Sequence, residues 1–412
     1  MSEQGRAWFT EPQLDSIAEQ PFFSYIAAGV LRKARDQDWK ILVQGRYNYV
    51  DGLPLGVDMK LPRTPAVFSR KVRWRKYDDS EAQHIKENYS TVTDNVPVLR
   101  EQFEQDAQEG MMCRLHLDEA KIRWPHDRLR IAALGSIQKG DDSFRILHDG
   151  THGVQVNNAI RQRDQINQPG AAEERFLQYD QQTSAPGVHF VLKSDASKAH
   201  RRFKVVEEDW GYQACSLELP EVWINQVGTF GIATAAYWWG RLVAALGRIG
   251  MYLQRQEYVW TLLFADDFKQ NAHGPIKYFN LLLFLLIMSA LGMPFSLKKC
   301  VGGIECDWVG YWCDYKLFQV GLSDSRCQWL CSWIRRQLSQ KTTVMRDFVE
   351  GLGRMGFAAQ VLDRMRPFLA PLYSWSSAIP EGTRLNKPFA CSDVPEVRLQ
   401  ETFHAGRSQS FN

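Results

Sequence analysis

Two adjacent carboxylates between two apolar runs constrain this chain more than any other feature of its sequence. Residues 257–271 read EYVWTLLFADDFKQN, which predicts a strand, a short turn and a second strand, with Asp266 and Asp267 at the tip of the hairpin. Neighbouring carboxylates repel each other unless a cation lies beside them, and a divalent metal ion is the obvious cation. The alternative is a solvated turn, where Asp is common because it hydrogen-bonds locally. The rest of the chain must therefore supply the other parts of a metal site.

A third carboxylate follows an earlier strand. Residues 188–193 read as a strand that ends on Ser194 and Asp195, and a strand end is a rigid place for a metal ligand. Asp195 and Asp266 are 71 residues apart (266 − 195 = 71), with a long helix at 230–253 between them, so two strands can lie side by side. Three converging carboxylates suit Mg²⁺, and two such ions would activate an attacking 3′-hydroxyl and stabilise a leaving pyrophosphate. This chemistry is nucleotidyl transfer.

Composition permits a polyanionic partner without demanding one. The 412 residues carry a net charge of +3 and are 44% hydrophobic, which is typical of a globular protein of two or three domains. Cations cluster at 70–76 (RKVRWRK) and 326–341, which suits a phosphate backbone, although such runs are usually solvated faces. Without a signal peptide or a zinc-type Cys spacing, we expect an intracellular protein with reduced cysteines. The apolar stretch 281–295 is too short for a bilayer, which predicts a buried helix and no membrane partner.

Regions on either side of these strands also have recognisable patterns. Residues 96–121 carry apolar and charged residues at helical spacing, which predicts helices ending near Pro125. Residues 129–149 contain two strand-like runs around the charged turn GDDS, which predicts a second hairpin. Residues 329–338 and 345–366 again have helical spacing. We find no internal repeat.

Taken in order, the motifs resemble those of a reverse transcriptase of the retroelement type. The three that carry the chemistry are FVLKSDASKAHRRF (190–203), similar to the first carboxylate motif, QVGTFGIATAAYWW (226–239), similar to the template- and nucleotide-binding motif, and FADD (264–267), similar to the aromatic-x-Asp-Asp box. Three others resemble the basic motif (MPFSLKKC, 293–300), the primer grip (WVGY, 308–311) and the fingers hairpin (KGDDSFRILHDGTHGVQVN, 139–157). The resemblance covers about residues 90–375, and the long forms of the motifs are most similar to retrotransposons of the tyrosine-recombinase group.

The resemblance implies an α+β fold, the right-hand polymerase, with fingers, an antiparallel-sheet palm and a helical thumb. The implied parts are an N-terminal extension of unknown role (1–87), fingers and the start of the palm (88–187), the palm (188–320), thumb and connection helices (321–375) and an irregular tail (376–412). The implied activity is RNA-directed DNA polymerisation, in which dNTPs extend a primer strand on an RNA or DNA template. RNase H and integrase parts have no room in the last 37 residues (412 − 375 = 37).

The resemblance also implies a role for each charged residue of the site. Asp195 and Asp266 would coordinate two Mg²⁺ or Mn²⁺ ions, and Asp267 would tune the field or bind in a second geometry. Phosphoryl transfer leaves the protein little covalent work, so positioning and charge neutralisation supply most of the catalysis. Lys139 and Arg145, across the fingers hairpin, would clamp the incoming triphosphate, since both side chains donate to phosphate oxygens. Taken alone, that pair would be an exposed charged turn.

Other residues acquire a role only through the resemblance. Gly231 would let the backbone approach the template or nucleotide closely, because glycine has no Cβ. Lys299 or its neighbour Lys298 would protonate the leaving pyrophosphate, and the alternative is a basic loop in solvent. His200 stands where the family usually has Tyr or Phe beneath the sugar, so sugar discrimination is open.

The primer grip separates this interpretation from its rivals. The residues that would support the primer terminus are Trp308, Val309, Gly310 and Tyr311, and the alternative for them is an ordinary core strand. One rival function is a catalytically dead retroelement remnant that only binds nucleic acid. Another is a different palm enzyme, such as an RNA-templated RNA polymerase or a nucleotide cyclase, against which the fingers hairpin and WVGY argue. Fold alone does not decide between them.

Overall fold

The structure is a computed structural model that describes residues 20–57, 59–64, 69–71, 80–139, 143–183, 187–254, 258–340, 342–379 and 388–390. Its α-helices are α2 (Ser24–Lys33), α3 (Trp39–Val43), α4 (Ser90–Thr93), α5 (Val96–Gln108), α6 (Leu117–Arg123), α7 (Val156–Ala159), α8 (Ala171–Thr183), α9 (Ala233–Leu253), α10 (Lys277–Ala290), α11 (Asp324–Ser339), α12 (Met345–Ala358) and α13 (Arg366–Ser377). Its strands are β1 (Ser69–Arg70), β2 (Met112–His116), β3 (Ile131–Ala132), β4 (Leu134–Gln138), β5 (Phe144–His148), β6 (Asp164–Gln165), β7 (Phe190–Asp195), β8 (Ala214–Cys215), β9 (Glu221–Asn225), β10 (Val259–Phe264), β11 (Asp267–Ala272), β12 (Val301–Gly303), β13 (Glu305–Trp308), β14 (Tyr311–Asp314), β15 (Gln319–Leu322), β16 (Thr342–Val344) and β17 (Pro388–Ala390).

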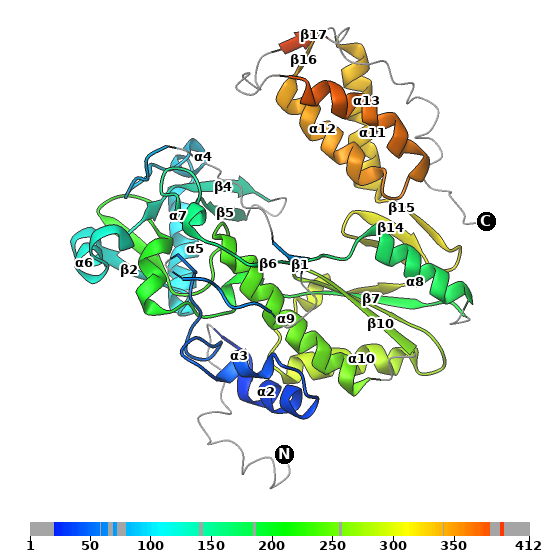
Figure 1. Cartoon of the computed structure of the whole chain (residues 1–412), viewed down its shortest axis with the longest axis horizontal. Helices are drawn as coiled ribbons and strands as arrows, with labels where there is room; N and C mark the ends of the chain where they lie inside the picture. Colours follow the sequence, from blue (N-terminus) through cyan, green and yellow to red (C-terminus); the bar gives the residue numbers. More distant parts are fainter. Residues whose placement is uncertain are drawn as a thin grey trace.

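A four-stranded antiparallel sheet, which we call the central sheet, carries the predicted carboxylates. Its order is β10-β11-β7-β12, so the strand that ends on Asp195 lies beside the strand that begins at Asp267. Helices α9 and α10 cover one face, where Phe268 of β11 packs 5.7 Å from the ring of Phe284. Helix α8 and the three-stranded sheet β13-β14-β15 cover the other face (Figure 1). The residues of β7, β10 and β11 are buried or partly buried between these layers, whereas Val301 and Gly302 of the edge strand β12 are exposed.

The sheet β2-β9-β8-β3 and the hairpin β4–β5 lie at the left of Figure 1. The predicted hairpin within residues 129–149 is confirmed. The helices predicted over 96–121 and ending near Pro125 are confirmed in part, as α5 and as α6, which ends at Arg123, but residues 112–116 between them form β2 instead. Gly110 reverses the chain there with a φ of +75°, and β2 then pairs with β9 from Met112 to His116.

The helices predicted at 329–338 and 345–366 are confirmed as α11 and α12, except that α12 ends at Ala358. Helix α13 was not predicted, because Pro367 and Pro371 interrupt the helical pattern, yet Pro367 is tolerated in its first turn. All three helices stand above the central sheet in Figure 1. They share a core with β13, β14 and β15. The expectation of an irregular tail needs one correction, because Pro388–Ala390 forms β17 and pairs with β16. The rest of the tail, residues 380–387 and 391–412, lies outside the described residues, as does most of the basic run 70–76.

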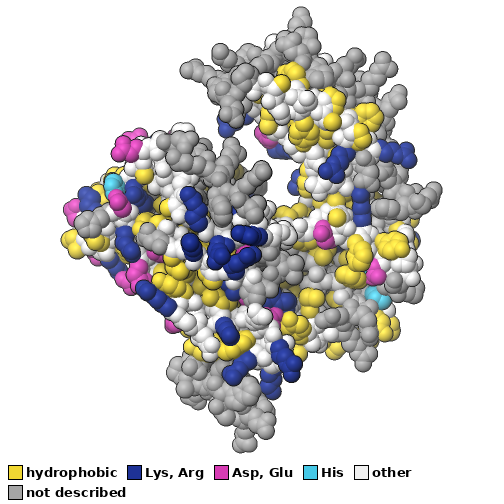
Figure 2. Space-filling view, in the orientation of Figure 1, with side chains coloured by type: hydrophobic (Ala, Val, Ile, Leu, Met, Phe, Trp, Pro, Cys, Tyr) yellow, Lys and Arg dark blue, Asp and Glu magenta, His cyan; other side chains and the backbone are white. Residues whose placement is uncertain are grey.

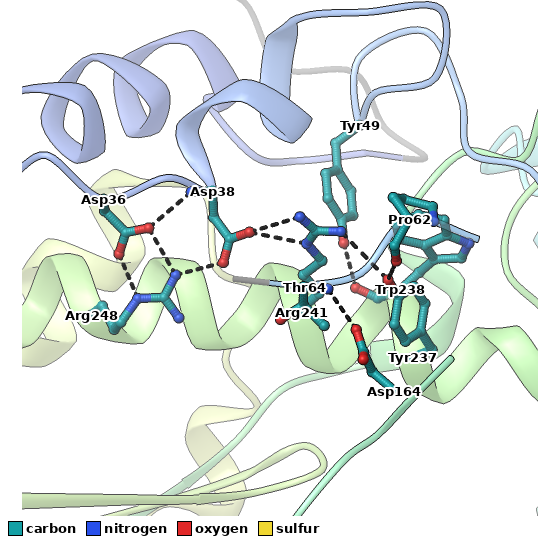
Figure 3. A network of polar contacts seen from close by, with 10 residues as sticks. All are labelled: Asp36, Asp38, Tyr49, Pro62, Thr64, Asp164, Tyr237, Trp238, Arg241 and Arg248. Atoms are coloured by element: carbon teal, nitrogen blue, oxygen red, sulfur yellow. Dashed lines mark hydrogen bonds and ion pairs between the residues drawn. The ribbon is translucent and has the colours of Figure 1, made fainter. Parts of the chain in front are cut away.

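The N-terminal segment 20–64, which the sequence left without a role, packs against α9 (Figure 3). The Asp38 carboxylate pairs with two guanidinium groups of that helix, at 2.9 Å to Arg241 and 2.7 Å to Arg248. Asp36 adds a 2.6 Å contact to Arg248. The Tyr49 hydroxyl donates to the carbonyl of Trp238 at 2.6 Å. The segment therefore belongs to the same hydrophobic core as α9 and α10.

Helix α10 differs from the expected buried helix. Its inner face is buried in two clusters, but Phe279 is 62%, Leu282 59% and Leu286 66% exposed. The prediction failed because an all-apolar helix is usually buried on every side, and this one covers only a single face of the sheet. None of the described helices has the length and apolar character that a membrane span requires.

Candidate active site

The three predicted carboxylates meet at one end of the central sheet. Asp267 is the first residue of β11 and pairs across the strands with Asp195, the last residue of β7. Asp266 lies in the two-residue turn before it, and its carbonyl accepts a hydrogen bond from the amide of Ala196 at 3.0 Å. The other turn residue, Ala265, has a φ of +53°, which is uncommon for a residue with a Cβ. The predicted hairpin is confirmed, except that Asp267 belongs to the strand rather than to its tip.

The protonation of Asp267 depends on burial and on the charges of its neighbours. The pKa of Asp267 is raised, by burial first and then by the charges of Asp266 and Asp195. Lys193 and Lys299 act in the opposite direction without reversing the shift. Lys299 donates to the Asp195 carboxylate at 2.7 Å, and this hydrogen bond is the main reason why its own pKa is raised. An ion pair between the predicted basic loop and the first carboxylate was not foreseen from the sequence.

The donor chemistry fits a divalent cation, although the side chains are not yet arranged around one. Within the described residues, no three His, Cys, Asp or Glu side chains form a ready metal-binding group. One Asp195 oxygen is instead engaged by the Lys299 ammonium. Carboxylate oxygens are the ligands that Mg²⁺ takes in proteins, and the raised pKa of Asp267 marks a site where a cation would relieve repulsion.

A cleft of about 520 Å³ joins this cluster to the fingers hairpin. The predicted residues that line it are Lys139, Arg145, Asp195, His200, Asp266 and Lys299. They come from four separate segments: the β4–β5 hairpin, the end and following turn of β7, the β10–β11 turn, and the loop before β12. Figure 2 shows Lys and Arg side chains gathered beside the hollow between the two halves of the molecule. Asp267 does not line the cleft, because it lies in the paired part of β11.

His200 is held inside this cleft by an aromatic neighbour. Its ring meets the ring of Phe230 edge to face, with centroids 5.7 Å apart. Burial lowers the pKa of His200, and the nearby charge of Asp266 offsets part of that effect. The neutral imidazole is therefore favoured at neutral pH.

The backbone at Gly231 approaches another part of the chain, whereas the sequence predicted a close approach to the template or nucleotide. Its φ is +106°, and a Cβ at this position would overlap the carbonyl oxygen of His148 in β5. Asn157 bridges the same place, donating to the Gly231 carbonyl at 2.7 Å and accepting from the amide of Ala233 at 2.7 Å. The close approach is thus between the start of α9 and the fingers hairpin, and Gly231 itself does not line the cleft.

Sequence reasoning missed a charged cluster in the wall of the cleft. Arg201 is partly buried; it donates to the side-chain oxygen of Asn225 at 2.7 Å and lies 3.2 Å from Asp106. Lys198 bridges Asp106 at 3.0 Å and Glu109 at 2.9 Å. The available signal was the basic run KAHRR together with two acids three residues apart in a predicted helix. These acids hold Lys198 and Arg201 against α5.

Trp308 ends β13 and pairs with Tyr311, which begins β14, and Val309 and Gly310 connect the two strands. Val309 and Gly310 make the turn with φ values of +52° and +86°. A β-branched residue in this region is a conformational outlier, so its surroundings must hold it. Tyr311 is buried by stacking on Phe357 of α12, with centroids 4.5 Å apart. The turn is therefore fixed between the central sheet and the C-terminal helices.

Comparison with known proteins identifies the fold. No protein-family model matches the chain, and no curated protein matches it by sequence. Among solved structures, it is similar to the foamy viral protease-reverse transcriptase dRH in complex with double-stranded DNA, with a TM-score of 0.53 and 14% identity over 75% of this chain and 49% of that one. It is also similar to the foamy viral protease-reverse transcriptase in complex with an RNA/DNA hybrid (TM-score 0.51, 14% identity, 76% of this chain and 38% of that one) and in complex with double-stranded DNA (0.51, 14%, 76% and 59%).

The chain thus spans between 38% and 59% of the length of these proteins. At 14% identity the likeness shows the fold alone. The predicted fold class is confirmed: this is an α+β chain with a reverse-transcriptase-like, right-hand polymerase fold.

Proposed function

We propose that the chain is an RNA-directed DNA polymerase that adds deoxynucleotides to the 3′-hydroxyl of a primer. The observation that carries the proposal is a single cleft in which Asp195 and Asp266 face the basic residues Lys139 and Arg145 of the fingers hairpin. Asp267 pairs directly behind them. Carboxylates opposite phosphate-binding cations are what nucleotidyl transfer requires, because its transition state is stabilised chiefly by charge and position.

Asp195, Asp266 and Asp267 would hold two Mg²⁺ or Mn²⁺ ions. Such ions, when bound, activate the 3′-hydroxyl and neutralise charge on the leaving pyrophosphate. Lys299 must leave Asp195 before that carboxylate can accept a cation with both oxygens. A lysine ammonium is protonated at neutral pH, so after leaving Asp195 it is available to donate to a pyrophosphate oxygen.

The remaining residues would bind and orient the substrates. Lys139 and Arg145 are exposed at the mouth of the cleft and would donate to the triphosphate. His200, braced by Phe230, would lie beneath the sugar. The turn at Val309 and Gly310 would support the primer terminus. The structural neighbours hold double-stranded DNA or an RNA/DNA hybrid, which supports a template–primer duplex as the partner, bound through its backbone and shape.

Two finer parts of the proposal rest on sequence resemblance. The motif forms favour a retrotransposon of the tyrosine-recombinase group as the source, and the intracellular location that we expect from the sequence is compatible with that source. The rival function is a remnant that binds the hybrid without turnover, and the ion pair between Lys299 and Asp195 favours it, because that pair occupies a metal-binding oxygen.

Primer extension separates these functions. Purified protein should extend a labelled DNA primer on an RNA template with dNTPs and Mg²⁺, and Asp266→Asn should abolish extension while leaving hybrid binding by fluorescence anisotropy unchanged. The matched control is Asp118→Asn, which removes an exposed carboxylate of α6. Hybrid binding without incorporation by the wild type would establish the remnant, and incorporation of ribonucleotides in place of dNTPs would establish another palm polymerase.

A further inference from the structure

Two lysines lie in register behind the two paired carboxylates. In the pairing of β11 with β7, Lys269 faces Lys193, two residues along from the pair of Asp267 and Asp195. Because side chains two residues apart in a strand point to the same face, all four project from the same side of the central sheet. The row of carboxylates is therefore backed by a row of ammonium groups, and Lys193 lowers the pKa of Asp267 as part of that arrangement.

Lys269 is fully buried and makes all its polar contacts on the far side of the sheet from α9 and α10. It forms an ion pair with the fully buried Glu174 of α8 and donates to the hydroxyl of Tyr315. That hydroxyl in turn donates to Glu174 at 2.6 Å. The Lys269 ammonium also lies 5.0 Å from the centre of the Trp308 ring, a cation–π distance.

Lys193 reaches the same structure from the neighbouring strand. Its ammonium donates to the backbone carbonyl of Asp307 in β13. Asp307 and Trp308 directly precede the turn at Val309 and Gly310, and Tyr315 directly follows β14. The two strands that carry the carboxylates are thus each tied by a lysine to the one hairpin, β13–β14.

A buried ion pair is an inefficient way to stabilise a core, because apolar side chains of the same volume are often as stable or more so. What it adds is a defined arrangement. We propose that Lys193 and Lys269 are positioning residues that fix the β13–β14 turn relative to Asp195 and Asp267. Under the proposed function, on which this inference rests, they set where the primer 3′-hydroxyl lies relative to the carboxylates.

A merely structural role predicts something different. If Lys269 served only to attach α8 through Glu174, then Lys193, which is half-buried and donates to Asp307 in β13, would have no part in that attachment. Under the proposal, removing either lysine loosens the same hairpin. Lys193→Met tests this without leaving a buried charge unpaired. The double variant Lys269→Met/Glu174→Gln removes both charges of the buried pair together.

Hydrogen exchange measures the tie without using activity. In both variants, with an unchanged thermal midpoint, backbone amides of residues 305–315 should exchange about tenfold faster, because local opening of the hairpin becomes easier. Amides of β4 and β5 should exchange as in the wild type. Lys193→Arg should restore slow exchange, and Lys277→Met, on the opposite face of the sheet, is the matched control. Wild-type exchange over 305–315 in both variants would overturn the proposal, whether or not the protein extends primers.

Primer extension then tests the consequence. In both variants kcat should fall roughly 10- to 100-fold, the cost of a displaced reacting group, with the KM for dNTP and the Kd for the hybrid unchanged. Faster exchange with an unchanged kcat would overturn the positioning role. A wild type that binds the hybrid but never extends it would refute the proposed polymerase, and with it the primer role, while the exchange result would still decide whether the lysines hold the hairpin.

Discussion

Asp267 should oppose folding and yet be required for activity, and Asp267→Asn separates the two effects. Cβ atoms of paired cross-strand residues lie about 5 Å apart, and Asp267 is paired with Asp195. Two unit charges at about that distance repel by about 3 kcal/mol when the effective dielectric constant is about 20. Lys299 and Lys193 offset part of this repulsion. We therefore expect the variant to be more stable than the wild type by about 1–2 kcal/mol near neutral pH without metal.

The direction in which pH changes the stability of the wild type follows from the pKa of Asp267. The pKa of Asp267 is raised in the folded protein, so the native state binds the proton more tightly than the unfolded chain does. The wild type therefore loses stability as pH rises from the unfolded value of about 4 through the folded pKa, and remains at the lower level above it. Asn carries no charge at any pH. The advantage of the variant should be absent near pH 4, grow across that window and then stay constant.

Thermal unfolding with EDTA, at pH 4 and pH 7.5, measures this advantage. If the palm unfolds as a unit of ordinary domain size, the variant midpoint should be roughly 2–4 °C higher at pH 7.5. Adding Mg²⁺ should raise the wild-type midpoint by mass action and raise that of the variant much less, and primer extension should be lost. Asp118→Asn again serves as the control. A variant that is less stable at pH 7.5 would refute the charge-repulsion argument, and an equal response to Mg²⁺ would refute a metal role for Asp267.

Two further predictions concern the parts that hold the site. Gly231→Ala should lower the free energy of unfolding in urea by about 2–4 kcal/mol, since the added Cβ would overlap the His148 carbonyl. The control Gly247→Ala, which has open space around it in α9, should raise the free energy of unfolding by about 0.5–1 kcal/mol. Equal effects of the two substitutions would contradict the close contact at Gly231. Asp38→Ala should lower the free energy of unfolding in urea by about 3–5 kcal/mol, because it leaves the buried charge of Arg241 without its partner. The double variant Asp38→Leu/Arg241→Met should recover most of that loss. A double variant as unstable as the single one would show that the unpaired charge is not the cause.

The parts of the fold that the sequence predicts are those with local signals. The strand ending on Asp195 and the hairpin at Asp266 have apolar runs and a turn within about ten residues, and both are confirmed. Strand β2 has no such signal. It is five residues long, and its first residue, Met112, pairs with Asn225, which is 113 residues away (225 − 112 = 113). Its partner, and not its own composition, makes it a strand.

The role of the N-terminal segment was hidden for a related reason. Arg241 and Arg248 are seven residues apart, so they lie on one face of α9 in an otherwise apolar helix. That pattern predicts that buried acidic side chains pair with the two arginines. The pattern does not indicate which acidic residues these are, and the actual partners, Asp36 and Asp38, lie about 200 residues earlier in the chain. Pairing across such a distance follows from the fold and is not readable from either segment alone.

The candidate site likewise contains features that local sequence signals predict and features that they do not. Its carboxylates are predictable because they belong to short motifs, but the partners of the nearby lysines are not: Lys299 from the loop after α10 pairs with Asp195. Lys193 in β7 and Lys269 in β11 instead contact Asp307 and Glu174, which lie more than 90 residues away in the sequence. Each lysine has a different partner. Lys299 pairs with Asp195 at the exposed end, where a metal ion can displace it, whereas Lys269 is locked to Glu174 in the interior and cannot respond. In the proposed mechanism, therefore, only Lys299 exchanges partners during a reaction, and the inner lysines keep the geometry constant while it does so.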